Sequence, residues 1–142
     1  MFETKEIWRQ LWLESINVLT SLKLQKNSCE NGVNGDSYHS LVKYVNCYFE
    51  IVLHGFDYEF YINDIEWITQ EEYEIIKDWH NELHRYVALK PARFSSSILS
   101  DMNWLNILCD GWLAKQKLML ILPKFESKIL TEITEPNCSP SL

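Results

Sequence analysis

The chain of 142 residues is 46% hydrophobic and 13% aromatic, which is long and apolar enough for one packed domain without disulfides or a bound metal. Its formal net charge of −7 repels nucleic-acid phosphates, so direct binding of DNA or RNA is not expected. The longest apolar run near the C-terminus, Leu118–Leu122, is too short to span a membrane, and the N-terminal "MFETKEIW" has acids where a signal peptide has basic residues, so a cytoplasmic protein is expected.

The first predicted element is a helix from Glu3 to about Gln25, because apolar residues recur there every three or four positions. These residues are Ile7, Trp8, Leu11, Trp12, Ile16, Leu19 and Leu22. Residues 27–36 follow with two Asn-Gly pairs and no apolar period, which predicts a loop.

A second helix is predicted from a cap at Asp36 or Ser37 to a stop at Gly55. Residues 56–68 are less regular. The alternation in "YEFYI" is consistent with a short strand, and an extended connection that packs its aromatic side chains inward fits equally well.

A third helix is predicted to begin at Thr69, which has the spacing of a capping box with Glu72. In a capping box each of the two side chains accepts a hydrogen bond from the backbone N–H of the other residue. This helix is predicted to run to about Leu89 and to end at Lys90-Pro91, because the residue before a proline disfavours the helical conformation.

A fourth helix is predicted between a cap at Ser100 or Asp101 and a stop at Pro123. Its apolar residues wrap around most of the helix axis, which predicts that this helix is the buried one. These residues are Trp104, Leu105, Leu108, Cys109, Trp112, Leu113 and Met119. Gly111 predicts a close contact with another helix, because glycine inside a helix costs about 1 kcal/mol relative to alanine.

Residues 124–134 are predicted to form one more short helix, and residues 135–142 a loose tail. Four long helices with short connections indicate an all-α bundle, a single helical domain over residues 1–134. The four cysteines have no C-x-x-C spacing, so free thiols are expected, with Cys47 and Cys109 in the core.

No motif in the chain specifies a reaction, and no cofactor is expected. His80 and His84 are one helical turn apart, which is the spacing of a two-histidine metal site. A third ligand is missing, and Asn81 stands where the zinc-protease motif has glutamate. A non-enzymatic protein is therefore expected, and a metal-dependent enzyme or regulator that uses His80 and His84 is kept as an alternative.

The negative charge is concentrated between Glu50 and Glu82, where ten acids and one base give a local charge of −9, against +2 for the rest of the chain. Glu74, Asp78 and Glu82 recur at a spacing of four, at which like charges destabilise a helix by a few tenths of a kcal/mol. Helix stability therefore does not explain this spacing of acids. The alternative is that the acid run is only a solvated helix face, which has no function. A surface for a basic partner is the preferred interpretation. The acids expected to supply its field are Asp57, Glu59, Asp64, Glu66, Glu71, Glu74, Asp78 and Glu82.

Aromatic residues lie among these acids, and Tyr and Trp are the residue types in which binding energy concentrates at protein interfaces. Trp67, Tyr58, Tyr61 and Tyr73 cannot all fit into a small core. We therefore expect Trp67, Tyr58 and Tyr61 to anchor the partner.

Three stretches carry a resemblance to a known class of proteins: "LVKYVNCYFEIVLHG", "EWITQEEYEIIKDWHNELHRY" and "ILSDMNWLNIL", which together cover about Leu41 to Leu108. In layout and composition they resemble small acidic bacterial immunity proteins of contact-dependent inhibition and polymorphic toxin systems. The resemblance implies a non-enzymatic cytoplasmic inhibitor that binds a cognate toxin, often a nuclease, and it assigns no individual residue. A nucleic-acid mimic, which inhibits a DNA- or RNA-binding enzyme, remains an alternative, and the oligomeric state stays open.

Overall fold

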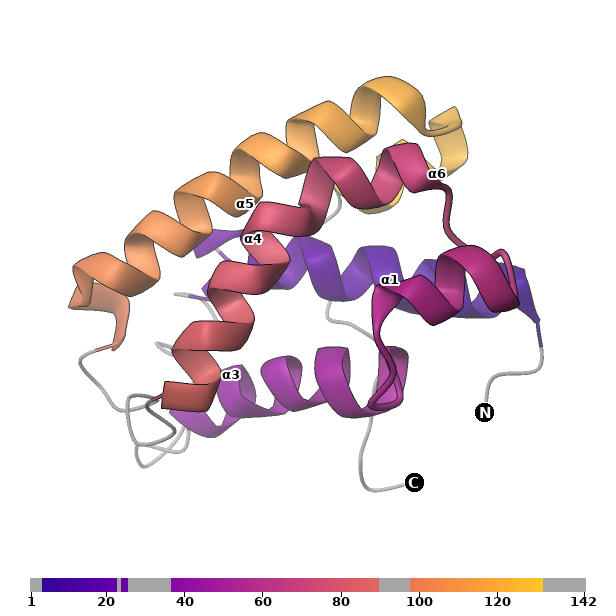
Figure 1. The fold of residues 1–142 in the computed structure, drawn as a ribbon. Coiled ribbons are helices and arrows are strands. Elements are labelled where there is room, and N and C mark those ends of the chain that lie inside the picture. The colour runs from indigo at the N-terminus through magenta and orange to yellow at the C-terminus, as the bar shows by residue number, and fades with distance from the viewer. Residues whose placement is uncertain (1–3, 23, 26–36, 90–97, 132–142) are drawn as a thin grey trace.

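The computed structural model describes residues 4–22, 24–25, 37–89 and 98–131, and the regular elements in these ranges are helices (Figure 1). In chain order they are α1 (Lys5–Leu19), α3 (Ser37–Asn46), η1 (Cys47–Val52), η2 (Phe60–Asp64), α4 (Gln70–Leu89), η4 (Ile98–Ser100), α5 (Met102–Ile121) and α6 (Lys124–Ile129). Elements η1 and η2 are π-helical, and η4 is a turn of 3-10 helix. The described ranges contain no strand, which confirms the predicted all-α class.

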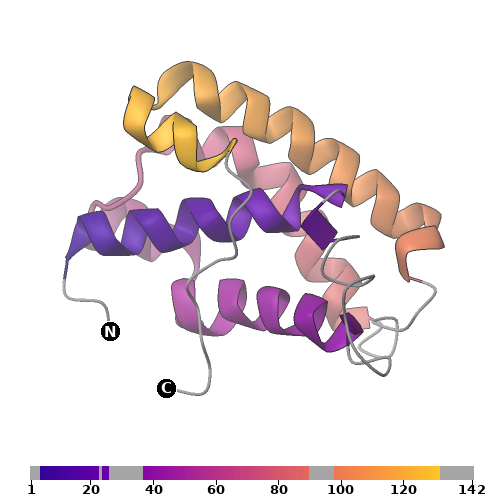
Figure 2. The ribbon, with the colours of Figure 1, turned by 180° about the vertical axis from the view of Figure 1, so that it is seen from behind.

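Helix α1 lies at the centre of the bundle. Figures 1 and 2 show α3 on one side of α1 and α5 with α6 on the other, and α1 contacts all three. Every residue from Trp12 to Leu19 is buried, including three polar ones. One of these, Asn17, accepts a hydrogen bond from the Lys115 ammonium of α5 at 3.3 Å, which offsets part of the cost of burying it.

Helix α5 lies at the periphery, so the prediction that it is the buried helix is wrong. Its most extensive contact is with α4. Its inner side is buried, whereas Trp112 and Leu113 on its outer side are each half exposed. The apolar residues that surround the α5 axis therefore belong to two different faces, only one of which packs on the core.

Side-chain hydrogen bonds end α1 earlier than its apolar period predicts. The Thr20 hydroxyl donates to the carbonyl of Ile16 at 2.7 Å, and the Gln25 amide donates to the carbonyl of Val18 at 2.9 Å. These bonds satisfy carbonyl groups that have no partner at a helix end. The continuous helix consequently stops at Leu19 instead of near Gln25.

The second predicted helix is present, but it changes its winding. Helix α3 continues directly into the π-helical η1, and the chain then turns at His54 and Gly55. Their φ angles of 54° and 74° lie in the left-handed region, which glycine adopts most readily. Gly55 is therefore confirmed as the stop of this helix.

Residues 56–68 contain helical turns, so both the short strand and the extended connection predicted for them are wrong, although Tyr58 and Tyr61 do pack inward. In η2 the Tyr61 hydroxyl donates to the carbonyls of Val52 and Leu53 at 3.1 and 2.6 Å. The indole N–H of Trp8 also donates to Val52, at 2.6 Å. These side chains satisfy carbonyls at the end of η1, and this capping accounts for an aromatic pattern that resembles a strand.

The two predicted helix starts are confirmed at the level of individual hydrogen bonds. The backbone N–H of Thr69 donates to the Glu72 carboxylate at 2.9 Å, and the N–H of Glu72 donates to the Thr69 hydroxyl at 3.1 Å, which completes the capping box. At the start of α5 the Asp101 carboxylate accepts from the N–H of Asn103 at 2.9 Å.

The C-terminal part agrees less closely with the sequence prediction. Helix α6 ends at Ile129, which is shorter than the predicted 124–134. The predicted loop 27–36 with its cap at Asp36, the break at Lys90-Pro91 and the tail 135–142 lie outside the described residues.

Gly111 permits the close contact that its position in a helix predicts. A Cβ atom at Gly111 would lie 2.6 Å from Cγ2 of Thr20 and 2.7 Å from both Cδ1 and Nε1 of Trp79. The absence of a side chain therefore allows the Trp79 ring of α4 to lie against α5. Nε1 of Trp79 is buried and has no hydrogen-bond partner in the described part of the chain.

The cysteines differ from the expectation of free thiols in the core. Cys47 is buried as expected, but it is disulfide-bonded, so the free-thiol expectation is wrong for it. Cys109 is a free thiol as expected, but it is exposed on α5 and does not belong to the core. Since α5 has an outer apolar face, an apolar period alone cannot tell on which side Cys109 lies.

Candidate protein-binding surface

Most of the acids predicted to form a partner-binding surface reach solvent. The exposed ones are Asp57, Glu59, Asp64, Glu66, Glu71, Glu74 and Asp78, whereas Glu82 is partly buried. None of these eight forms an ion pair with another residue in the described ranges. The charge of the seven exposed carboxylates is therefore not neutralised by an ion pair within this part of the fold, and they contribute a negative field around it.

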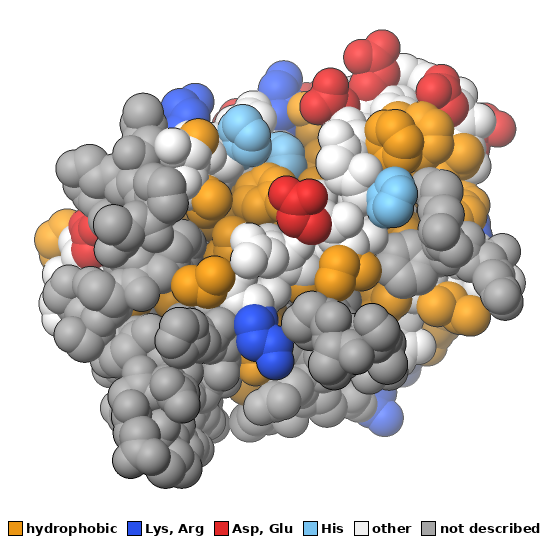
Figure 3. Space-filling model, turned by 90° about the horizontal axis from the view of Figure 1, so that it is seen from below, with side chains coloured by type: hydrophobic (Ala, Val, Ile, Leu, Met, Phe, Trp, Pro, Cys, Tyr) orange, Lys and Arg blue, Asp and Glu red, His pale blue; other side chains and the backbone are white. Residues whose placement is uncertain are grey.

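The fold separates Asp57 from Asp78 and Glu82, although all three belong to the acidic window of residues 50–82. Asp78 and Glu82 line a groove between α4 and α5. Asp57 lies near His80, whose charged form it stabilises. His80 is about 160° from both Asp78 and Glu82 around an α-helix axis, so Asp57 lies toward a different side of α4 from Asp78 and Glu82. Figure 3 shows one face of the molecule, with Asp and Glu side chains gathered along an edge beside hydrophobic and His side chains.

Two of the three predicted aromatic anchors are wrong. Tyr58 and Tyr61 are only 2% and 0% exposed, so a partner cannot reach them. Trp67 is partly buried and remains accessible on one side. The most exposed aromatic side chain of residues 56–68 is Phe56, which is 44% exposed and stacks on Phe60 with ring centroids 4.4 Å apart. Phe56 directly follows Gly55, the predicted end of the second helix, and this position is the signal in the sequence for its exposure.

Tyr58 belongs to a chain of hydrogen bonds that leads from the core toward the surface. The Trp12 indole N–H donates to the Tyr58 hydroxyl at 2.9 Å. The Tyr58 and Tyr48 hydroxyls are 2.7 Å apart, and the Tyr48 hydroxyl is 2.7 Å from Nδ1 of His80. When His80 is neutral and Nδ1 accepts, each hydroxyl hydrogen in the chain has an acceptor. Buried polar groups need such partners, which explains why Tyr58 lies inside.

His80 is a member of this network. Burial, reinforced by the charge of His84, lowers the pKa of His80 to about 4, and Asp57 acts in the opposite direction. The ring is therefore neutral at pH 7 and its Nδ1 is occupied by Tyr48. His84 is exposed. The described part of the chain holds no cluster of three or more His, Cys, Asp or Glu side chains arranged to bind a metal ion.

The groove between α4 and α5 has a volume of about 260 Å³ and brings together carboxyl groups that are far apart in sequence. Asp78 and Glu82 line it from α4, and Asp110 and Lys117 from α5. Burial, a hydrogen bond to Asp110 and the charge of that residue raise the pKa of Glu82 to about 7, although Arg85 opposes the shift. Sequence reasoning missed Asp110, because it lies outside the acidic window and no local pattern links it to Glu82.

Replacement of Glu82 by glutamine is expected to stabilise the protein at pH 8 and to have a much smaller effect at pH 5. The folded pKa is raised, so the unfolded chain releases this proton near its ordinary pKa of 4.5 and the folded chain only near 7. Stability is therefore full below about pH 4.5 and is lost as the pH rises through about 7. Glutamine carries no charge, and its amide can donate a hydrogen bond to the Asp110 carboxylate at any pH. We therefore expect the melting temperature of the variant at pH 8 to be roughly 3 °C or more above that of wild type.

Thermal unfolding of wild type and variant at both pH values measures this effect. Glu71→Gln on the exposed first turn of α4 is the matched control, because it removes the same charge away from Asp110. Its effect should be the same at pH 5 and pH 8. Equal melting curves for wild type and Glu82→Gln at pH 8 would contradict the carboxyl pair.

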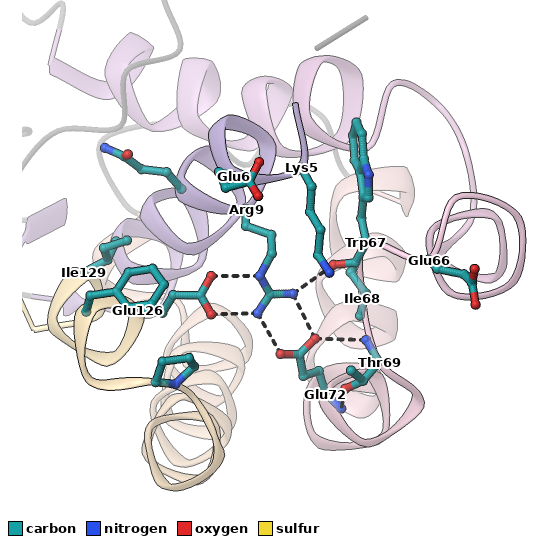
Figure 4. Close-up of a pocket in the computed structure, with 13 residues that line it drawn as sticks. Lys5, Glu6, Arg9, Glu66, Trp67, Ile68, Thr69, Glu72, Glu126 and Ile129 are labelled. Carbon is teal, nitrogen blue, oxygen red and sulfur yellow. Dashed lines mark hydrogen bonds and ion pairs between the residues drawn. The ribbon is translucent and has the colours of Figure 1, made fainter. Parts of the chain in front are cut away.

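A second cavity, of about 470 Å³, lies between α1, the residues that precede α4, and α6. Within it the Arg9 guanidinium uses all five of its N–H groups (Figure 4). It donates to Glu126 at 2.8 and 2.9 Å, to Glu72 at 2.7 and 3.0 Å, and to the Trp67 carbonyl at 2.8 Å. Burial alone would raise the pKa of Glu72, but the hydrogen bonds from Arg9 and Thr69 and the charge of Arg9 together hold this pKa below its usual value. Since Arg9 has no donor left for a ligand, the cluster is a structural tie between α1, α4 and α6.

Comparisons of the chain with protein-family models, with curated proteins and with solved structures find no match. Within the described ranges no helix combines the length and the apolarity needed to cross a membrane.

Proposed function

We propose that this protein is a non-enzymatic immunity protein, which binds and neutralises a cognate toxin domain, in the first instance a nuclease, through an acidic surface with aromatic residues. The observation that carries the proposal is the set of seven exposed carboxylates, none of which forms an ion pair with a described residue. Phe56 and the accessible side of Trp67 replace Tyr58 and Tyr61 as the aromatic part of this surface.

The chemistry of a nuclease fits such a surface. A nuclease needs a basic cleft to bind phosphates, and an acidic protein can occupy that cleft and exclude the substrate. Opposite charges also accelerate the encounter of two proteins, by orders of magnitude at low salt. Fast capture is valuable for an inhibitor that has to reach the toxin before it acts.

A pull-down with the tagged protein from its native host, or from cells that co-express the gene immediately upstream, tests the proposal. Recovery of one basic toxin domain in equimolar amount, released by high salt or denaturant, would support it. Recovery of many nucleic-acid enzymes would instead support the mimic, and recovery of no partner would contradict the proposal.

Simultaneous reversal of Glu74 and Asp78 to lysine is expected to slow association with the captured toxin by about tenfold or more at low salt, because electrostatic steering is lost. Stopped-flow mixing at two salt concentrations measures the association rate. Glu59→Lys with Asp64→Lys is the comparison variant, since it changes the net charge equally at other exposed acids of the proposed surface. The slower of the two variants identifies the acids that face the toxin. Unchanged rates for both would contradict the role of the acidic window.

The proposal includes a cytoplasmic location, and one finding counts against it. Cys47 is disulfide-bonded, and disulfides persist mainly in oxidising compartments. Alkylation of free thiols in intact cells, followed by mass spectrometry of the peptide that contains Cys47, decides between a cytoplasmic and an exported protein.

A further inference from the structure

Helix α5 carries an apolar face that no described element covers. Met102, Trp112, Leu113 and Leu120 are 66%, 50%, 50% and 85% exposed, and the free thiol of Cys109 lies among them in sequence and is exposed as well. At 100° per residue these five positions fall within about 100° of the helix circumference, and they extend over roughly 27 Å. Figures 1 and 2 show that the side of α5 turned away from α1 meets no other described helix.

The core does not require this outer face. Trp104, Leu108 and Leu118 on the inner side of α5 are at most 4% exposed, and they attach the helix to the bundle. Scattered exposed apolar residues are ordinary, but a row of them along one helix face marks an interaction site. A row of this width and spacing is what a second helix packs against, because the side chains of two helices interdigitate along such a seam.

Acidic residues border this face on one side. Asp110 is only about 60° from Leu113 around the α5 axis, and across the groove it meets Asp78 and Glu82 of α4. Lys117 lines the same groove and offsets only part of this charge. A cation from a partner would replace the proton that the Glu82–Asp110 pair retains. A second copy of this chain would bring the same carboxyl groups and a further net charge of −7, so charge complementarity favours a basic occupant.

We propose that the outer face of α5, formed by Met102, Cys109, Trp112, Leu113 and Leu120, docks an amphipathic helix of a partner protein whose basic residues lie along the Asp110 side. This inference deepens the proposed function, and it rests on that function in taking the partner to be a basic protein. The partner would then have a basic amphipathic helix that packs on α5, in addition to the basic cleft of the proposed function.

A synthetic helical peptide tests the docking face without knowledge of the partner. The probe has three heptads, with leucine at the a and d positions and lysine or arginine at the others, and it carries a fluorophore for anisotropy. A scrambled peptide of the same composition controls for charge alone. We expect saturable one-to-one binding of the amphipathic peptide only, together with slower alkylation of Cys109 in the complex. Equal binding of the scrambled peptide, or no binding of either, would overturn the proposal.

Variants locate the binding on α5. Leu113→Glu is expected to weaken binding about 30-fold or more, as central apolar contacts do. Leu120→Glu, at a more exposed position, serves as a second variant in case Leu113→Glu disturbs the fold. Ile7→Glu is the matched control, because Ile7 is 51% exposed on α1, and it should bind like wild type. Asp110→Asn should weaken binding less and reduce its dependence on salt.

Two outcomes separate this proposal from the proposed function. If wild type and Leu113→Glu capture the same toxin equally and the peptide does not bind, the docking face is overturned while the proposed function stands. If the peptide binds as expected but no toxin is captured, the proposed function fails while the docking face stands. A dimer in sedimentation of the protein alone that Leu113→Glu dissociates would also overturn the proposal, because a second copy would then cover the face.

Discussion

Replacement of Arg9 by alanine is expected to lower the free energy of unfolding by about 3–5 kcal/mol, as removal of one member of a buried ion pair does. The Glu72 and Glu126 side chains are only 8% and 10% exposed, and without the guanidinium both carboxylates lose their counter-ion. The four hydrogen bonds that join α1 to α4 and α6, and the fifth to the Trp67 carbonyl before α4, are lost at the same time. Urea unfolding at pH 7, followed by circular dichroism, measures the change.

Two control variants separate the tie from general effects of charge. Lys5→Ala removes a cation that lines the same cavity but forms no ion pair with a described residue, and it should change stability by less than about 0.5 kcal/mol. Arg9→Lys keeps the charge but cannot serve two carboxylates with a planar fork, so we expect an intermediate loss. A loss below about 1 kcal/mol for Arg9→Ala would show that the cluster does not hold the three helices together.

Replacement of Gly111 by alanine is expected to destabilise the protein by about 1–3 kcal/mol, which is the usual cost of overpacking a core. Helix propensity alone predicts the opposite sign, a gain of about 1 kcal/mol. The added methyl group would lie 2.6–2.7 Å from Thr20 and from the Trp79 ring, and neither the buried ring nor the end of α1 can move away freely. Urea unfolding gives the sign directly, and a stabilised variant would contradict the close contact.

A neighbouring exposed position and a double-mutant cycle complete this test. Asn106→Ala lies on the exposed side of the same helix, and it should change stability by no more than about 0.5 kcal/mol. Trp79→Phe shortens the ring that meets position 111 and removes the unpaired Nε1. The loss caused by Gly111→Ala should therefore be smaller in the Trp79→Phe background, with a coupling energy of about 0.5–3 kcal/mol.

Local chemistry in the sequence predicts the helix ends better than the burial of each helix. Thr69, Glu72, Asp101 and Gly55 act within a few residues, so their positions in the sequence suffice to predict the starts of α4 and α5 and the stop after η1. The central position of α1 is different, because it depends on partners for polar groups, such as Lys115 for Asn17, that lie far along the chain. An apolar period shows that a helix has an apolar face, but it does not show whether this face is buried or which element covers it.

The candidate surface shows the same difference between features set by local sequence and features set by contacts between distant residues. The exposure of most of the acids follows from charge alone, since ionised carboxylates are rarely buried without a partner. Tyr58 and Tyr61 are amphipathic, and only the positions of Val52, Leu53 and Tyr48 in space reveal that their hydroxyls are satisfied inside. Asp110 and the outer face of α5 depend on the packing of α4 against α5, which no local pattern encodes.

The central position of α1 also bears on how the chain is made. Synthesis proceeds from the N-terminus, so α1, which the others surround, emerges from the ribosome before the other described helices. Glu126, which completes the coordination of Arg9, follows 117 residues later. Until α5 and α6 have emerged, Asn17 lacks Lys115 and Arg9 lacks Glu126, the partners that these α1 residues have in the finished bundle. The packing of α1 is therefore completed only after the last described helices have been made, and the polar groups that it buries have to wait for partners from the far end of this region.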